Sequence, residues 1–212
     1  MKTGFPLKNR IIIIGSGNAA MSAGIAALEN GSCVTILEKA PEKLSGGNTK
    51  YTAGAMRFCF NGMEDLIPLL QDPNDPRLKN TEFGSYSETQ FANDLLSFND
   101  GQPLSDEQKI LVDQSYDAIK WLASHNIKFE PIFDRQSFKK DGKHVFWGGL
   151  ALSAANEGIG LFEQERDAFL NLGGELLYEK EVTRLSYAEG QVDGVNVGKE
   201  YYPADAVILA CG

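Results

Sequence analysis

The residues of this chain best suited to bind a ligand are two glycines and one acid near its N-terminus. The segment Gly15-Ser16-Gly17-Asn18-Ala19-Ala20 follows four consecutive isoleucines, and Glu38 ends a second apolar run at residues 34–37. This pattern is typical of a buried parallel strand, a tight turn, a helix and a second strand. The free amides and the dipole at the start of the helix favour binding of a pyrophosphate. An acid about 20 residues later can accept hydrogen bonds from ribose hydroxyls. The pattern predicts a dinucleotide site.

A second glycine-rich stretch follows the acid. Ser45-Gly46-Gly47-Asn48-Thr49 is succeeded by Thr52-Ala53-Gly54-Ala55, which is poor material for either a helix or a strand. A plain loop is one interpretation. We favour the other, in which the backbone lies close against a flat ligand while Asn48 and Thr49 offer amide and hydroxyl contacts.

Charge and composition exclude several classes of partner and site. The formal net charge is −9 and no run is rich in Lys or Arg, which argues against nucleic acid or an anionic membrane as the main partner. The apolar run before Gly15 is too short to span a membrane, so we expect a soluble, cytoplasmic protein without membrane insertion. The three cysteines and two histidines lack metal-ligand spacing, so we expect reduced thiols and no metal site.

Between the two glycine stretches and the C-terminus, the pattern predicts helices and then strands. Helices are expected at residues 63–70, 87–98 and 105–126. The last of these has Ser105 and Gln108 as a capping box and Ile110, Leu111, Ile119 and Leu122 as its apolar stripe. Strands are expected at 128–133 and at 137–147, with a hairpin turn at Asp141-Gly142.

A further helix is expected from about Phe162 to the glycine pair Gly173-Gly174, which can end it. The remaining sequence alternates short β runs with turns. Strands are predicted at 175–178, 182–187, 192–197, 200–202 and 206–210.

Tyr116 and Lys120 have the YxxxK spacing of short-chain dehydrogenases, in which the lysine lowers the pKa of the tyrosine. We reject this interpretation because the glycine pattern differs, and because any helix places residues i and i+4 together.

In this order, the motifs resemble those of the FAD-binding subunit family of fumarate reductase and succinate dehydrogenase, of the FAD-binding 2 type. Residues 46–57, Gly-Gly-Asn-Thr-Lys-Tyr-Thr-Ala-Gly-Ala-Met-Arg, are most similar to tricarballylate dehydrogenase-like members. The resemblance extends over the whole chain and includes Trp121-Leu122-Ala123-Ser124-His125, Gly158-Ile159-Gly160-Leu161, residues 181–185 and the closing Val207-Ile208-Leu209-Ala210-Cys211-Gly212. It implies an α/β, Rossmann-like FAD-binding fold with a central parallel sheet, a mostly helical insertion and a small β-meander.

The resemblance also implies a cofactor and its contacts. The pyrophosphate would lie against the first glycine turn, the adenosine ribose at Glu38, adenine at the backbone of Val182, and the isoalloxazine near the second glycine stretch. Residues 45–54 contain no histidine, where succinate dehydrogenases attach flavin covalently, so noncovalent FAD is expected. The implied cofactor-binding residues are Gly15, Gly17, Asn18, Ala19, Ala20, Glu38, Lys39, Gly46, Gly47, Asn48, Thr49, Thr52, Ala53, Gly54, Val182, Ala210, Cys211 and Gly212.

The chain departs from the family at its C-terminal end. Family members continue into a capping domain that supplies the proton donor and the carboxylate-binding groups, and nothing here corresponds to it. We therefore assign no catalytic residue. The expected organisation is a nucleotide-binding core formed by residues 1–60 and 150–212, with the insertion at 61–149 and the C-terminal catalytic part absent.

The resemblance implies the FAD-binding portion of an oxidoreductase that acts on a carbon–carbon bond of a di- or tricarboxylate. Its partners would be a small carboxylate substrate and an electron-transfer protein, and uncovered apolar surface predicts self-association. We expect this portion to be inactive alone. Two alternatives are a noncatalytic nucleotide-binding remnant and a nicotinamide-dependent dehydrogenase.

Overall fold

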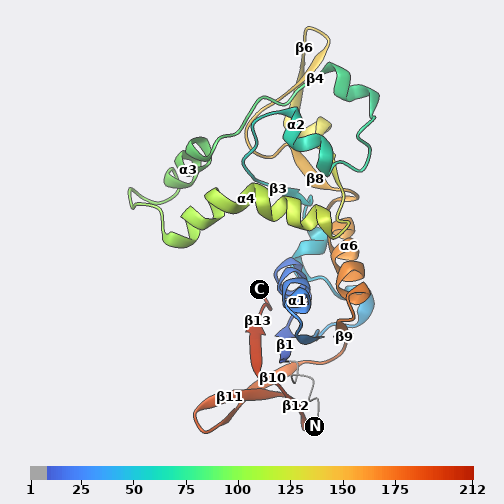
Figure 1. Ribbon diagram of the computed structural model, residues 1–212, viewed down its shortest axis with the longest axis vertical. Coiled ribbons are helices and arrows are strands. Elements are labelled where there is room, and N and C mark those ends of the chain that lie inside the picture. The colour runs from blue at the N-terminus through green and yellow to red at the C-terminus, as the bar shows by residue number, and fades with distance from the viewer. Residues whose placement is uncertain (1–8) are drawn as a thin grey trace, which may run out of the picture. The chain divides into compact units, whose positions relative to one another are not determined.

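The computed structural model describes residues 9–212, which divide into two compact units. Of the described residues, the first unit comprises 9–52 and 161–212, and the second comprises Ala53–Gly160. Each unit has its own sheets (Figure 1).

The first unit is built on a parallel sheet of four strands in the order β13-β1-β2-β9. The isoleucine run forms its inner strand β1, which pairs along its length with β2 and β13. The central isoleucines Ile12 and Ile13 are buried, as the β-branched sequence predicts. The bounds are β1 (Arg10–Ile14), β2 (Cys33–Leu37), β9 (Glu175–Leu177) and β13 (Ala206–Leu209).

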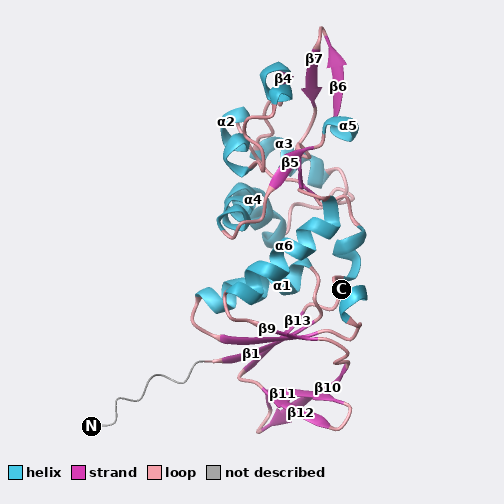
Figure 2. Cartoon of the chain, turned by 90° about the vertical axis from the view of Figure 1, so that its right-hand side faces the viewer, coloured by secondary structure: helices cyan, strands magenta, loops and turns pink. Residues whose placement is uncertain are grey.

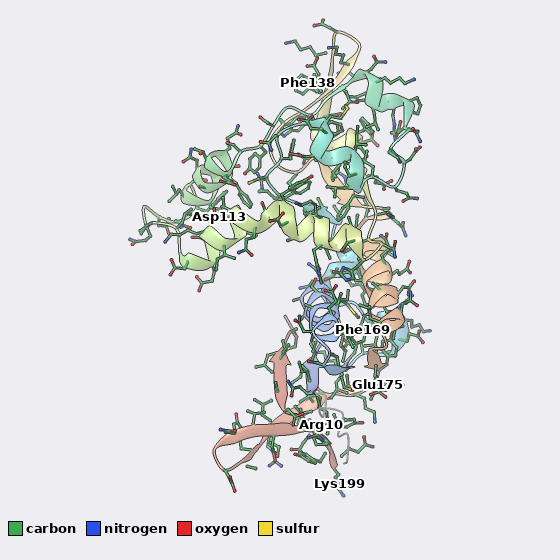
Figure 3. The ribbon with its side chains drawn as sticks, viewed as in Figure 1. Arg10, Asp113, Phe138, Phe169, Glu175 and Lys199 are labelled. Atoms are coloured by element: carbon green, nitrogen blue, oxygen red, sulfur yellow. The ribbon has the colours of Figure 1, made fainter. Side chains whose placement is uncertain are left out.

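Helices cover one face of this sheet and an antiparallel meander covers the other (Figure 2). On the helical face lie α1 (Asn18–Glu29) and the part of α6 (Glu157–Asn171) that belongs to this unit. Phe169 of α6, labelled in Figure 3, is fully buried at Gly24 of α1, where a Cβ would approach its ring to 2.8 Å. The bare backbone of Gly24 therefore lets the two helices pack closely.

The meander consists of β10 (Val182–Ala188), β11 (Gln191–Val197) and β12 (Glu200–Pro203). It packs on the sheet through a cluster in which Ile12 and Leu37 meet Val195 and Ala204. Arg10 joins the two layers at their edge, since its side chain pairs with Asp205 at 3.2 Å. Apolar burial on both faces fixes the sheet and leaves its strand ends for ligand contacts.

The described part of the second unit contains the long helix α4, three shorter helices and two three-stranded sheets, of orders β3-β8-β5 and β4-β7-β6. Short 3-10 turns lie at residues 67–69 and 76–80 of this unit, and at 42–44 and 47–51 of the first unit. The bounds are β3 (Ala55–Met56), α2 (Met63–Leu66), β4 (Thr81–Glu82), α3 (Glu88–Leu96), α4 (Asp106–Ser124), β5 (Phe129–Pro131), α5 (Phe133–Gln136), β6 (Ser137–Lys140), β7 (Lys143–Phe146) and β8 (Leu152–Ala154).

The predicted α/β fold with a central parallel sheet and a small β-meander is confirmed. The Ser105–Gln108 capping box is also present, with both of its hydrogen bonds formed. The hairpin turns at Asp141-Gly142, where both residues have positive φ, as the sequence predicts.

Four details of the sequence prediction are wrong. Ile119 and Leu122 of the predicted stripe are buried, but Ile110 and Leu111 are half-exposed, because Val112 and Ser115 complete the buried face of α4 in their place. Phe133 begins a short helix rather than ending a strand, and its ring packs on Phe146.

The sequence also predicts too late a start for α6, which begins at Glu157, and it misses β8 altogether. The strand β8 is built from Leu, Ser and Ala and is completely buried between β3 and β5. Small residues carry little β-propensity, so pairing and burial decide its conformation.

Candidate functional site

A cavity of about 880 Å³ opens in the first unit, beyond the carboxyl ends of β1, β2 and β13. In open α/β sheets, ligands bind in the crevice at these strand ends, and cavities for small ligands have this order of size. The lining residues are Ile14, Gly15, Ser16, Gly17, Asn18, Ala19, Leu37, Glu38, Lys39, Gly47, Asn48, Thr49, Lys180, Glu181, Val182, Leu209, Ala210, Cys211 and Gly212.

The turn after β1 requires glycine at its first position. Gly15 has a φ of +99°, and a Cβ there would lie 2.5 Å from the carbonyl oxygen of Ala210. Neighbouring strand ends close around it, since the Gly15 amide donates to Leu37 O at 2.9 Å and the Ala210 amide donates to Ile14 O at 2.9 Å. The first glycine thus lets the ends of β1, β2 and β13 meet at the floor of the cavity.

The second glycine of the turn, Gly17, allows the 47–51 turn to approach the start of α1. Gly17 has an ordinary extended backbone, and a Cβ there would approach Thr49 Oγ1 to 3.2 Å. Thr49 Oγ1 accepts a hydrogen bond from the Asn18 amide at 2.9 Å, so the 47–51 turn caps the first residue of α1. The amides of Ala19 and Ala20 precede the first intrahelical bond, from Met21 N to Gly17 O, and remain as donors at the positive end of the helix.

Glu38 is buried and lies at the end of β2, where its two carboxylate oxygens have separate partners. Ser16 Oγ donates to Oε2 at 2.5 Å, and the Ala40 amide donates to Oε1 at 2.8 Å. The Gly46 amide in turn donates to Ser16 Oγ at 3.1 Å. Each carboxylate oxygen keeps a further lone pair, so Glu38 can still accept from hydroxyl groups in the cavity.

Lysine side chains and a strand backbone form another part of the wall. Lys39 follows Glu38, while Lys180, Glu181 and Val182 lead into β10. Lys180 is paired with Glu200 at 2.8 Å, and this hydrogen bond raises the pKa of Lys180. The wall next to Glu38 is therefore mixed in charge, and the Lys180 amide ties it to the end of β2 by donating to Glu38 O at 2.9 Å.

Most of the residues predicted to bind a cofactor line this one cavity. Five of them do not. Ala20 is fully buried in α1, Gly46 lies against the Phe162 ring with a φ of +101°, and Thr52 is exposed beside Thr49. Ala53 and Gly54 belong to the second unit, where Gly54 has positive φ and lies against the backbone of Glu157. Gly46 and Gly54 are therefore explained by local packing and backbone conformation, without a ligand contact.

Sequence reasoning missed Ser16 and Lys180. Ser16 stands between the two glycines, where any residue fits the motif, but its hydroxyl joins Glu38 to the Gly46 amide. Lys180 could have been recognised only from its position just before Val182.

The YxxxK pair has partners that do not suit catalysis. The Tyr116 hydroxyl donates to the carbonyl of Asp65 at 3.0 Å, and Lys120 pairs with Asp117 at 2.7 Å. Burial raises the pKa of Tyr116, whereas the dehydrogenase role needs a lowered pKa. These contacts support the rejection of that interpretation.

A second cavity, of about 490 Å³, lies within the second unit and has an acidic lining that includes Asp65, Glu88, Asp113 and Asp117. Among residues 9–212, no three His, Cys, Asp or Glu side chains are grouped so that they could hold a metal ion. In the same part of the chain, no helix is long and apolar enough to cross a membrane.

Known proteins resemble this chain in sequence. Residues 10–212 match the model of the family described as FAD binding domain. The cytochrome-type fumarate reductase of Shewanella frigidimarina is 26% identical over 212 residues, which cover 95% of this chain and 33% of that protein. The chain thus spans about a third of the length of the fumarate reductases that it matches.

Solved structures with the same fold include one of a dehydrogenase and one of a reductase. The 3-ketosteroid-Δ4-(5α)-dehydrogenase of Rhodococcus jostii RHA1 has a TM-score of 0.67 at 19% identity, covering 100% of this chain and 47% of that one. The open form of a flavocytochrome c3 fumarate reductase has a TM-score of 0.64 at 22% identity, covering 99% and 34%. With the family model matching nearly its whole length, the chain belongs to the FAD binding domain family.

Proposed function

We propose that the cavity at the strand ends binds FAD and that this chain forms the FAD-binding portion of a flavin-dependent oxidoreductase. The observation that carries the proposal is the convergence of the Gly15–Asn18 turn, Glu38 and the 47–49 loop on one cavity. The family match favours FAD over the nicotinamide alternative. When bound, the flavin supplies hydride-transfer chemistry, while the protein binds and orients it.

Each part of the cavity suits one part of the cofactor. The amide of Ala19, which lines the cavity, would hold the pyrophosphate together with the α1 dipole. Glu38 would accept hydrogen bonds from the ribose of adenosine, and the backbone near Val182 would contact adenine. Asn48 and Thr49 would face the flavin end of the molecule.

Noncovalent attachment is part of the proposal, because residues 45–54 offer neither histidine nor cysteine. Of the three cysteines, only Cys211 lines the cavity. Acid precipitation of the FAD-loaded chain should release all of the flavin into the supernatant. Flavin that stays with the pellet of the wild type but not of Cys211→Ser would show a thioether link instead.

We further propose that the whole enzyme acts on a carbon–carbon bond of a di- or tricarboxylate, with an electron-transfer partner. The support is the fumarate reductase name of the matched relatives and the sequence at residues 46–57. A member specific for tricarballylate is the finer form of this proposal.

The test of the FAD site is the dissociation constant of FAD for Glu38→Ala. A hydrogen bond to a charged group is worth about 1.5–3 kcal/mol, so FAD binding should weaken roughly tenfold to a hundredfold. Glu42→Ala, which removes an exposed acid outside the cavity, is the matched control and should leave the constant unchanged. Equal constants for both variants and the wild type would mean that the ribose does not reach Glu38.

A further inference from the structure

Glu165 carries a buried carboxyl group that is only partly hydrogen-bonded. It lies on α6, it is completely buried, and its Oε2 atom has no hydrogen-bond partner among the described residues. Its other oxygen, Oε1, lies 3.3 Å from Ser22 Oγ of α1. Burying a carboxyl group without full pairing costs free energy, so a site that keeps one invites a functional explanation.

Ser22 links this carboxyl group to the cavity. Its Oγ atom is 3.3 Å from Glu165 Oε1 and also 3.3 Å from Asn18 Oδ1. The serine hydroxyl has one proton and therefore cannot donate to both acceptors. With Asn18 Oδ1 facing Ser22, as it does here, all three groups are paired only when Glu165 donates to Ser22 and Ser22 donates to Asn18.

Glu165 can donate because its carboxyl group is protonated near neutral pH. Burial raises the pKa of Glu165 to about 8, and the Ser22 hydroxyl opposes this shift because it can donate to the ionised carboxylate. A proton on Oε2 would be a buried donor without a partner, whereas a proton on Oε1 meets Ser22 Oγ. The second arrangement leaves only an unpaired acceptor, which is the more readily tolerated defect.

The order of donors fixes the orientation of Asn18. With Oδ1 accepting from Ser22, the two N–H groups of Asn18 Nδ2 are left for other partners, and Asn18 lines the cavity at the start of α1. The backbone amide of Asn18 is already held by Thr49. Side-chain donors at a helix N-terminus add to its attraction for an anion.

We propose that Glu165 and Ser22 are positioning residues that hold the Asn18 carboxamide with its Nδ2 donors toward the phosphate groups of the dinucleotide. The inference rests on the proposed FAD site and adds a proton-dependent control of it. Neither residue touches the cofactor.

Ionisation of Glu165 would reverse the arrangement. A carboxylate cannot donate, and as a charged acceptor it takes the Ser22 proton from Asn18. Burial and Ser22 are the only causes of the Glu165 pKa shift, and the adjoining Arg166 of α6 is paired with Asp167 at 2.9 Å. On the facing helix α1, the group that contacts Glu165 is the uncharged Ser22 hydroxyl. The affinity for FAD should therefore fall as the pH rises through about 8.

The first arm of the test measures FAD dissociation constants between pH 6.5 and 9.5. Over this pH range, FAD binding by the wild type should weaken roughly threefold to tenfold, because one neutral hydrogen bond is lost. Glu165→Gln keeps a donor and cannot ionise, so its affinity should match the wild type at pH 6.5 and stay constant. Ser22→Ala should bind weakly at every pH. Ser115→Ala, which removes a buried helix serine of the second unit, is the control and should behave as the wild type.

The second arm needs no FAD. The side-chain amide signals of Asn18, assigned with Asn18→Ala, are followed by NMR against pH in the ligand-free chain. They should shift with a midpoint near 8 in the wild type and not in Glu165→Gln or Ser22→Ala. Signals that do not change with pH, or FAD affinity that Ser22→Ala leaves intact, would overturn the inference. Failure of the wild type to bind FAD while these signals respond would overturn the proposed function alone.

Discussion

At the scale of single residues, the buried carboxyl group of Glu165 should make the free energy of unfolding depend on pH. Burial raises its pKa to about 8 in the folded chain, against an ordinary value of 4.5 for a glutamic acid. Between these values the folded state holds a proton that the unfolded state has lost, so stability falls as the pH rises. The slope for one group is about 1.4 kcal/mol per pH unit at most.

Urea unfolding from pH 4.5 to 9 measures this slope, with Glu165→Gln as the comparison. The difference in unfolding free energy, variant minus wild type, should grow up to about pH 8 and then level off. A difference that stays constant with pH would mean that Glu165 titrates alike in the folded and unfolded chain.

Single residues differ in how far the sequence could predict them. Glu38 was predictable because a strand pattern ends there at the distance from the glycines that ribose binding needs. Its bond to Ser16 was not predictable, since serine between two glycines has no distinctive signal. Glu165 had a signal that was overlooked: it lies three residues after Phe162 and four before Phe169, both buried, and so on the inner face of α6.

At the scale of elements, the site depends on the 47–51 turn being joined to the start of α1. The Asn18 amide donates to Thr49 Oγ1 at 2.9 Å and so joins the two. Thr49→Val keeps the shape of the side chain and removes this acceptor. We predict a loss of about 1 kcal/mol in unfolding free energy, and FAD binding that is weaker by roughly threefold to tenfold.

Thr183→Val is the matched control for this prediction. Thr183 is an exposed residue of β10 whose hydroxyl donates to Asn196 O at 3.3 Å, away from the turn. It should change FAD affinity little. Calorimetric titration of both variants with FAD is the measurement, and equal affinities would argue that the turn reaches the ligand without the help of Thr49.

Elements with a local signal were predicted and those without one were not. The α4 start follows from its capping box, and the hairpin from Asp141-Gly142, because both are decided by residues close in sequence. The exposed Ile110 and Leu111 and the buried β8 depend on which partner each surface meets. Such partners are tertiary and leave no local pattern.

At the scale of the whole molecule, the sequence order of strands was enough to predict the architecture of the nucleotide-binding unit. A strand, a glycine turn, a helix and a strand fix the right-handed parallel unit. The closing strand β13 then pairs beside β1, where Ala210 meets Gly15. The predicted division at residues 60 and 150 stays a prediction, beside two compact units that divide after Thr52 and Gly160.

The 212-residue chain assayed alone should bind FAD and turn over no substrate. Catalysis needs groups that stabilise the transition state better than the bound substrate, held in place over the flavin. The family resemblance assigns the proton donor and the carboxylate-binding groups to sequence that these residues do not contain, and the matched fumarate reductases are about three times as long. Leu209 at the cavity rim is also 65% exposed, which favours self-association.

The assay reconstitutes the chain with excess FAD and follows dye-linked oxidation of succinate and tricarballylate, and reduction of fumarate by reduced viologen. Free FAD at the same concentration is the control, and rates should not exceed it. Light scattering should report association that grows with protein concentration. Enzyme-like turnover would require an active site within the described residues, and the acidic cavity at Asp65 and Asp117 would be the first place to mutate, because several carboxyl groups line it.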